Sequence, residues 1–353
     1  MKKTAIILIR IIIILIFSLA ILELLARFFL PPIGLNLRGL YEVNNNKNDL
    51  PYDFKPNASL IVNGVVYKIN NQRFRAEKEY KKEKPKDTVR IAIIGDSVGF
   101  GYGLPIESTL NSQLEKQLKQ KTKKNIEVLN FAVPGYGIES NINIIDKKVK
   151  QFSPDIVIYV MCINDLTDNE TIDSQGNNLA FKGRRLETWV FTHSRLYSFI
   201  RSAWDYNKTV EENKAQLGRT GVVTNSALDG FQTFIISSFG TKEEYAKQYH
   251  QKLENKLTLY AQKAKEDKFT PIILVAPLEI QLRKNFDPQP QDETCKIAKS
   301  DNILCYNPLE KFKKEFDKQH KKLFLDFVHL DANGTAVLSS GINQFIENQK
   351  ILK

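Results

Sequence analysis

The sequence predicts an α/β protein: a three-layer sandwich with a central parallel sheet, preceded by an N-terminal transmembrane helix. From residue 88 onward, short β-branched runs alternate with segments of helical spacing, which is typical of parallel strands covered on both faces. The first thirty residues are instead almost continuously apolar. A chain of 353 residues, 42% of them hydrophobic, is long enough for one sizeable domain with appendages.

Residues 1–32 are expected to form a cytoplasmic tip and a transmembrane signal-anchor helix. Lys2 and Lys3 precede the apolar run, and residues 5–30 would span about 39 Å as a helix. The hydrocarbon core of a bilayer is about 30 Å thick, so this helix is long enough to cross it. The basic N-terminus favours an inside-N orientation, which places the rest of the chain outside the cytoplasmic membrane.

A cleaved signal peptide is the alternative interpretation of this segment. Ser18-Leu19-Ala20 is a small-residue site of the kind that is cleaved in such peptides. We favour the uncleaved anchor because the apolar pattern continues to Leu30 and stops only at Pro31-Pro32. The expected location is therefore the cell membrane, with a single pass and the folded domain on the periplasmic or outer side.

Residues 33–87 are expected to form a polar extracytoplasmic stem. Three consecutive asparagines and a lysine-rich stretch at 78–86 give it this polarity. Asn63-Gly64 separates two apolar triplets, residues 60–62 and 65–67, and this arrangement predicts a β-hairpin.

The domain itself is expected to span residues 88–353, with an insertion at about 166–240 where the alternation breaks. The expected strands are residues 88–94, 126–133, 156–161, 271–275 and 323–325. The expected helices are residues 107–120, 140–152, 242–267, 308–320 and a last one from Asp331, its cap, toward Gln349. Inside the insertion, residues 186–204 have helical spacing. The simpler interpretation is that this helix packs against the domain. The more specific interpretation is that it forms a lid or wall for the substrate.

The cysteines fit a location outside the cytoplasm. Cys295 and Cys305 are close enough in sequence for a local disulfide in an oxidising environment, and two buried free thiols are the alternative. Cys162 ends a strongly apolar strand and is expected to be a buried, inert thiol.

A net charge of +11 raises the question of a polyanionic partner. The lysines are scattered, and the sequence has no zinc-ligand spacing, no RNA-stacking motif and no basic helix with interleaved aromatic residues. We therefore expect a solvated lysine-rich surface, with no nucleic-acid partner, no metal and no cofactor. Attraction to an anionic envelope polymer or to lipid headgroups is the alternative.

Four separated segments carry polar or glycine residues just after a predicted strand. They are Gly95-Asp96-Ser97, residues 133–137, residues 162–165 and Asp326-Phe327-Val328-His329. Because parallel strands bring their carboxyl ends to one edge of the sheet, all four segments can converge there. The sequence thus predicts a site at that edge.

The side chains of these segments are those that acyl transfer requires. The hydroxyl of Ser97 is a poor nucleophile until a base removes its proton, and His329 can be that base. Asp326, three residues earlier, can accept the other ring N–H and hold the correct tautomer. The backbone N–H groups of Ser97 and Gly135 and the side-chain amide of Asn164 can bind the oxyanion. Two neighbouring aspartates, Asp96 and Asp165, are expected to be structural.

These residues, in this order, resemble the SGNH/GDSL hydrolase family, which is named for the serine, glycine, asparagine and histidine of its four motifs. The resemblance covers roughly residues 88–350 and implies a flavodoxin-like three-layer fold. The resemblance implies that Ser97 is the nucleophile and that Asp326 and His329 together act as the base. It also implies that the oxyanion hole is formed by Ser97, Gly135 and Asn164. The membrane-anchored bacterial members are the most similar type.

The sequence departs from the family pattern at three places. Cys162 stands where the third motif usually begins with glycine, and the stretch after Ser97 lacks the common leucine. Neither change removes a catalytic atom. Residues 70–75 look like a segment found in membrane-anchored members, with Arg73 at the usual glycine position.

The expected function is that of a serine esterase that cleaves an acyl ester through an acyl-Ser97 intermediate, with O-acylated envelope polysaccharide as a candidate substrate. An O-acyltransferase would use the same acyl-enzyme, and a lysophospholipase is a further esterase option. A non-enzymatic, membrane-anchored glycan-binding or assembly subunit is the third alternative. Gly95 to Gly99 also satisfies the nucleophile-elbow pattern of α/β-hydrolases, but here the serine follows the first strand of the domain.

Overall fold

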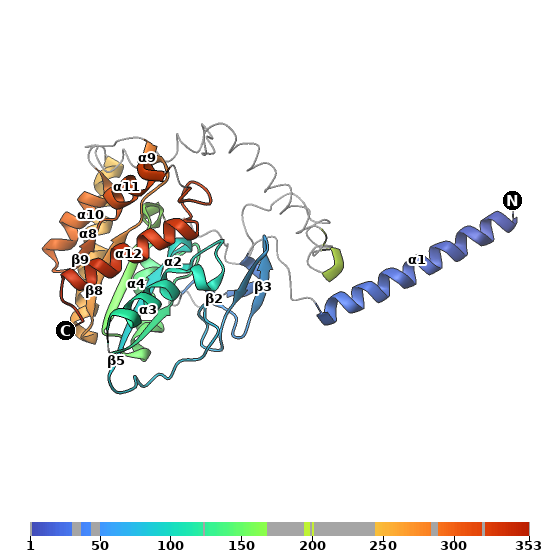
Figure 1. Ribbon diagram of the computed structural model, residues 1–353, viewed down its shortest axis with the longest axis horizontal. Coiled ribbons are helices and arrows are strands. Elements are labelled where there is room, and N and C mark those ends of the chain that lie inside the picture. The colour runs from blue at the N-terminus through green and yellow to red at the C-terminus, as the bar shows by residue number, and fades with distance from the viewer. Residues whose placement is uncertain are drawn as a thin grey trace.

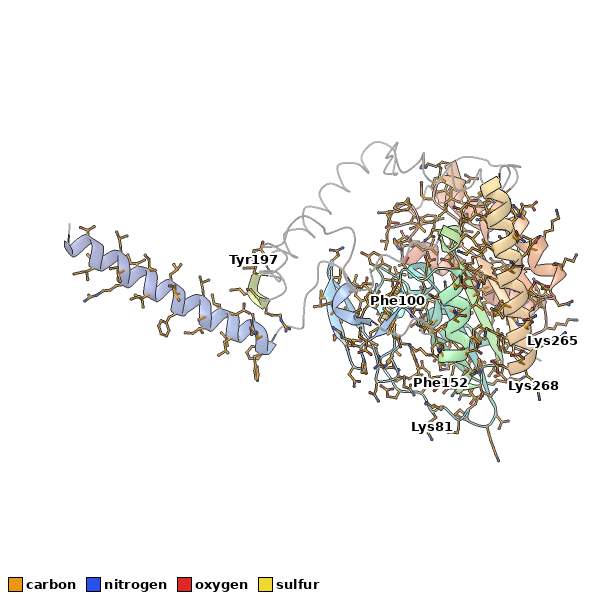
Figure 2. The ribbon with its side chains drawn as sticks, turned by 180° about the vertical axis from the view of Figure 1, so that it is seen from behind. Lys81, Phe100, Phe152, Tyr197, Lys265 and Lys268 are labelled. Carbon is orange, nitrogen blue, oxygen red and sulfur yellow. A yellow bond between two sulfur atoms is a disulfide. The ribbon has the colours of Figure 1, made fainter. Side chains whose placement is uncertain are left out.

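The computed structural model describes residues 2–29, 37–43, 50–122, 124–167, 194–197, 200, 244–283, 289–319 and 322–352. Helix α1 (Lys2–Phe29) projects away from an α/β domain built around one sheet (Figure 1). Figure 2 shows Lys81, Lys265 and Lys268 on the outside of the domain, and all three are exposed to solvent. This agrees with the expected solvated, lysine-rich surface.

The central sheet has five parallel strands in the order β6-β5-β7-β8-β9. They are β5 (Thr88–Gly95), β6 (Asn125–Asn130), β7 (Ile156–Met161), β8 (Thr270–Val275) and β9 (Leu304–Tyr306). Every residue of β7 is buried, which explains why its sequence is a continuous apolar run without alternation. The register pairs Ile93 with both Asn130 and Ile158, so these strands reach the same edge together.

Helices cover both faces of the sheet, as the opposite views of Figures 1 and 2 show. On one face, α3 (Leu110–Lys121) and α11 (Leu309–Gln319) both contact α12 (Ala332–Asn348). On the other face, α4 (Ile138–Lys147) and α10 (Pro290–Ser300) both contact α8 (Glu244–Asp267). This three-layer arrangement is the predicted fold class.

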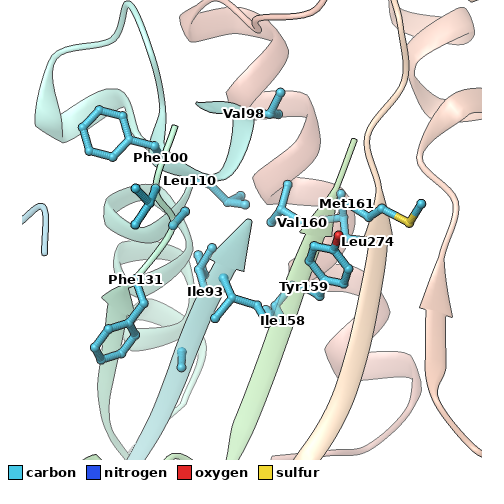
Figure 3. Packing of buried hydrophobic residues seen from close by; sticks show 14 of the residues in the cluster. Ile93, Val98, Phe100, Leu110, Phe131, Ile158, Tyr159, Val160, Met161 and Leu274 are labelled. Carbon is cyan, nitrogen blue, oxygen red and sulfur yellow. The ribbon is translucent and has the colours of Figure 1, made fainter. Parts of the chain in front are cut away.

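Fully buried side chains fill the space between the layers (Figure 3). Ile93, Ile158 and Leu274 come from three neighbouring strands, and none is accessible to solvent. Phe131 follows β6 and packs with Phe152 at 5.4 Å between ring centroids. This packing holds the strand ends rigidly, which matters because the polar segments start there.

Two predicted helices are shorter than expected. The helix predicted over 107–120 begins at Leu110, after a 3-10 turn at Ile106–Ser108. The helix predicted over 140–152 divides into α4 and a 3-10 turn at Val149–Phe152. Ser153 then takes a left-handed φ of 46°, which ends the helical geometry.

Two strand predictions are corrected by the structure. Residues 323–325 form no strand of the sheet, and Phe324 instead makes an isolated antiparallel bridge with Leu330. The fifth strand is β9, which follows α10, and the sequence pattern predicted neither element. With three half-buried residues, β9 is too short to show a period. The strand predicted over 126–133 ends at Asn130.

The structure contains the expected local disulfide and the expected buried thiol. Cys295 in α10 and Cys305 in β9 form a disulfide, which links the edge strand to the helix that precedes it. Cys162 is a buried free thiol. Burial raises its pKa well above the usual value, so the thiol stays protonated and inert.

The segment expected to be a stem packs against the domain. Its strands form two antiparallel pairs: β1 (Tyr41–Val43) with β2 (Tyr52–Phe54), and β3 (Ser59–Val62) with β4 (Val65–Lys68). The second pair is the predicted hairpin, with Asn63 and Gly64 at φ 49° and 77°. The ring of Phe54 stacks on Phe100 of the domain at 5.4 Å between centroids. The described part of this segment is therefore continuous with the domain's core rather than a spacer.

Helix α1 contains an apolar segment, Ile6–Phe29, long enough to cross a membrane, and nearly all of its side chains are exposed. Glu23 pairs with Arg27 at 2.8 Å, and it also accepts the backbone N–H groups of Arg195 and Leu196. Tyr197 lies beside α1 in Figure 2. Most of the helix predicted over 186–204, and most of the insertion that contains it, lies outside the described residues.

Candidate active site

The first polar segment turns the chain sharply at the end of the central strand. Gly95 has φ 151°, and a Cβ atom there would lie 2.5 Å from the carbonyl oxygen of Val160, so glycine is required. Asp96 then caps the short helix α2 (Ser97–Phe100), because its Oδ1 accepts the backbone N–H of Val98 at 2.8 Å. The turn leaves Ser97 partly exposed at the carboxyl edge of the sheet.

Three side chains form a continuous hydrogen-bonded chain at this edge. The Oγ of Ser97 lies 2.8 Å from Nε2 of His329, and Nδ1 of His329 lies 2.7 Å from Oδ2 of Asp326. Since the carboxylate can only accept, the proton belongs on Nδ1, and Nε2 is left to accept the hydroxyl proton of Ser97. The structure thus brings together residues that are 232 positions apart in the chain.

Asp326 is held by the loop that it helps to build. Its Oδ1 accepts the backbone N–H groups of Val328 at 2.9 Å and His329 at 2.8 Å. Burial alone would raise the pKa of Asp326, but the hydrogen bond and charge of His329, with the two backbone donors, outweigh burial and lower it. The carboxylate therefore stays ionised and keeps the imidazole oriented.

The other predicted residues lie in the loops that follow β7 and β6. Asn164 is in a 3-10 turn (Ile163–Thr167) after β7, and its Nδ2 is 3.5 Å from Oδ2 of Asp96. The same oxygen is 3.4 Å from Oγ of Ser97, so Asn164 and Ser97 share a neighbour. Gly135 lies in the loop after β6 with a φ of 85°. That loop is fixed to the end of β5 by the bond from the Val133 N–H to the Gly95 carbonyl, at 2.9 Å.

A buried polar network lies beneath the site. Oδ2 of Asp165 accepts the hydroxyl of Tyr159 at 2.7 Å and the backbone N–H of Cys162 at 3.3 Å, and Asn141 donates to it at 3.4 Å. Burial and the nearby charge of Asp96 raise the pKa of Asp165 well above its usual value. Both aspartates bond loop backbone, which agrees with the structural roles expected for them.

Sequence reasoning missed one residue that contacts the site. The ring of Tyr102 lies against the His329 imidazole, with 4.6 Å between centroids and a tilt of 39°. Its backbone N–H donates to the Ser97 carbonyl at 3.0 Å, so Tyr102 contacts both Ser97 and His329. No local pattern marks this tyrosine, because its contact depends on a loop 227 residues away.

A hydrogen-bonded serine, histidine and aspartate at the carboxyl edge of a parallel sheet are typical of serine hydrolases. The family model of GDSL-like lipase/acylhydrolases matches residues 91–342, and the chain belongs to this family. It is accordingly a hydrolase of ester bonds. Among the described residues, no group of three or more histidine, cysteine or acidic side chains is arranged to hold a metal ion.

Several solved structures are similar to the chain. An acetyl xylan esterase, AlAXEase, has 13% sequence identity and a TM-score of 0.44, with 73% of this chain and 100% of that chain covered. A lipase/acylhydrolase from Enterococcus faecalis has 15% identity and a TM-score of 0.42, with 74% and 96% covered. A two-domain esterase active on acetylated mannans has 11% identity and a TM-score of 0.44, with 74% and 50% covered. Among curated proteins, no match is found.

Proposed function

We propose that the domain is a serine esterase in which Ser97 is the nucleophile, His329 the general base and Asp326 the residue that orients the base. The observation that carries this proposal is the unbroken hydrogen-bonded chain from the Ser97 hydroxyl through the imidazole to the carboxylate. It is the geometry that activates a hydroxyl for attack on an acyl carbon.

In the first step, Oγ of Ser97 attacks the ester carbonyl while its proton passes to Nε2 of His329. The resulting oxyanion would be bound by the backbone N–H of Ser97, the backbone N–H of Gly135 and the amide of Asn164, each worth about 3 kcal/mol of barrier. Collapse of this intermediate expels the alcohol, which takes the proton from His329. The product is an ester between Ser97 and the acyl group.

In the second step, water attacks the acyl-Ser97 ester and gives a proton to His329, which returns it to Oγ as the carboxylic acid leaves. A sugar hydroxyl in place of water would make the same acyl-enzyme an O-acyltransferase. Both reactions share the first step, so the fate of the acyl group separates them.

The proposed substrate class is O-acylated polysaccharide of the cell envelope. Among the described residues, one apolar helix is long enough to span a membrane, and the basic residues at its N-terminal end support an uncleaved anchor that places residues 33–353 outside the cytoplasmic membrane. The hydrolase domain would span residues 88–353, interrupted in sequence by an insertion at about 166–240, and the described part of residues 37–87 packs against it. An esterase held there meets surface polymers rather than cytoplasmic esters.

The test uses full-length protein in detergent micelles, with short- and long-chain aryl esters and an active-site phosphonate. We expect turnover and stoichiometric labelling of the wild type, and loss of both in Ser97→Ala. Ser300→Ala is the matched control, because the Ser300 hydroxyl lies on the surface and bonds only local backbone. Unchanged turnover in Ser97→Ala would refute the assignment, and absent turnover together with absent labelling would favour a glycan-binding subunit.

A second assay separates hydrolysis from transfer. An acetyl donor is supplied with and without an oligosaccharide, and free acid and acylated sugar are measured by mass spectrometry. Free acid as the main product in both cases supports the esterase. Preferential formation of the acylated sugar would assign the acyltransferase instead.

A further inference from the structure

We propose that the turn formed by residues 70–75 belongs to the active-site architecture, with Arg75 as a positioning residue that holds the loop of Tyr102 against His329. The catalytic mechanism above gives this turn no role. The inference deepens the proposed function and rests on it, since its readout is ester turnover.

The turn itself fixes the direction of Arg75. Oδ1 of Asn70 accepts the backbone N–H of Phe74 at 3.1 Å, and its Nδ2 donates to the Lys78 carbonyl at 3.1 Å. Arg73 has φ 65°, the left-handed conformation that explains why glycine is usual there. Phe74 is buried against Phe131, with 4.7 Å between ring centroids. Arg75 therefore leaves the turn from a rigid base.

The guanidinium of Arg75 binds three backbone carbonyls of one loop. Nη1 donates to the carbonyls of Phe100 at 3.1 Å and Gly101 at 2.7 Å, and Nη2 donates to the Leu104 carbonyl. Carbonyls at the end of a helix lack intrahelical partners, so the fork satisfies groups that α2 leaves open.

The charge of Arg75 lies close to two aromatic rings. Its Cζ is 4.7 Å from the ring centroid of Tyr67 and 4.9 Å from that of Phe100. The side chain is buried, and burial lowers its pKa to about 10, so it is still cationic at neutral pH. A buried cation with this geometry leaves its loop little freedom to move.

The loop held by Arg75 is the one that contacts the hydrogen-bonded chain. The hydroxyl of Tyr67 accepts the N–H of Gly103 at 2.8 Å. Tyr67, like Arg75, precedes the sheet, so two residues of this region bind the loop. Between the residues bound by Arg75 and Tyr67, Tyr102 donates its N–H to the Ser97 carbonyl. Its ring centroid lies 4.6 Å from that of the His329 imidazole. Arg75 therefore acts on the imidazole of His329 through the loop of Tyr102.

A double-mutant cycle tests this route in the full-length protein in detergent. Arg75→Lys keeps the charge but loses the fork that reaches three carbonyls, and Tyr102→Leu removes the ring. We expect each variant to lower kcat per phosphonate-titrated site about tenfold with little change in KM. The double variant should lose no more than about threefold beyond either one, because both changes remove the same contact.

Two further variants separate positioning from stability. Leu257→Ala removes a fully buried side chain of α8 and none of the contacts described above, so we expect a lower melting temperature and an unchanged kcat below it. Tyr67→Phe keeps the stacked ring but removes the bond to Gly103, and it should lower kcat a few-fold at nearly unchanged melting temperature. If Arg75→Lys does not fold, the cycle of Tyr67→Phe with Tyr102→Leu decides.

The outcomes distinguish this inference from the proposed function. Wild-type kcat in Arg75→Lys, or effects that multiply to about a hundredfold in the double variant, would overturn the positioning role while Ser97 keeps its own. Full turnover in Ser97→Ala would remove the proposed function and the positioning role with it. A loss of kcat in Leu257→Ala equal to that of Arg75→Lys would show that kcat follows the stability of the fold rather than the position of the Tyr102 loop.

Discussion

At the scale of single residues, the site depends on one carboxylate that serves two kinds of donor. Asp326 accepts backbone N–H groups with Oδ1 and the ring of His329 with Oδ2. In Asp326→Asn, the backbone bonds can persist while the amide N–H faces the imidazole and favours the wrong tautomer. We expect kcat to fall about 10²- to 10⁴-fold with a small change in melting temperature. Esterase kinetics and calorimetry measure the two effects, and a loss below tenfold would contradict this role.

The buried carboxyl of Asp165 predicts that the free energy of unfolding falls as pH rises. An acid whose pKa is lowered on folding, such as Asp326, has the opposite effect. Burial and the charge of Asp96 raise the pKa of Asp165 in the folded state. The folded state therefore loses stability as pH rises above the pKa of an aspartate in the unfolded chain, about 3.9. The loss grows until pH reaches the raised folded value. In Asp165→Asn, the oxygen that accepts from Tyr159 remains and the ionisable group is gone. We expect a flatter dependence of unfolding free energy on pH between 5 and 8, measured by urea unfolding, and a slope equal to the wild type would refute it.

Residue types at strand ends predicted part of the site. Ser97 and Asn164 stand out because each is polar just after a buried strand, and topology brings strand ends to one edge. His329 meets Ser97 from the loop before α12, and not from the strand predicted over residues 323–325. Tyr102 and Arg75 could not be found this way. A buried tyrosine or arginine in a loop has no local signature, since its partners are distant backbone groups and rings.

At the scale of elements, prediction followed the strength of the periodic signal. The buried strands β5 and β7 and the capped helix α12 were predicted nearly to the residue, because continuous apolar runs and a cap are local features. Strand β9 has no such signal, and the sequence predicts a strand at residues 323–325 instead, where the structure has only an isolated bridge. Only the disulfide to α10 and the register with β8 distinguish β9 from the short apolar run that follows it.

The packing of α12 makes a prediction about a glycine inside a helix. Gly334 lies three residues after the cap Asp331, and a Cβ atom there would be 2.0 Å from the carbonyl oxygen of Leu323. Since that atom belongs to the backbone, the helix or the loop before His329 must shift. We expect Gly334→Ala to lower the unfolding free energy by about 1–3 kcal/mol, despite the better helix propensity of alanine. Chemical denaturation with the exposed neighbour Asn333→Ala as control measures this, and a gain in stability would contradict the close approach.

At the scale of the whole molecule, the described part of residues 37–87 packs into the core of the domain. Its aromatic side chains belong to the same buried cluster as the sheet, and two of them, Phe54 and Tyr67, stack on Phe100, three residues after Ser97. The polarity of the segment hid this, because lysine and asparagine residues outnumber the few buried rings. The folded unit therefore begins well before the point where strand–helix alternation starts.

This continuity predicts where the chain can be shortened. A protein that starts at residue 88 loses Phe54, Tyr67 and Phe74, all nearly inaccessible to solvent. Removing one buried aromatic side chain costs about 3–5 kcal/mol, and a whole domain is stable by only about 5–15 kcal/mol. We expect a chain that begins at residue 37 to be soluble and active, and a chain that begins at residue 88 to be insoluble or unfolded by circular dichroism. A cooperative thermal transition and full turnover in the shorter chain would show that the N-terminal segment is a dispensable stem after all.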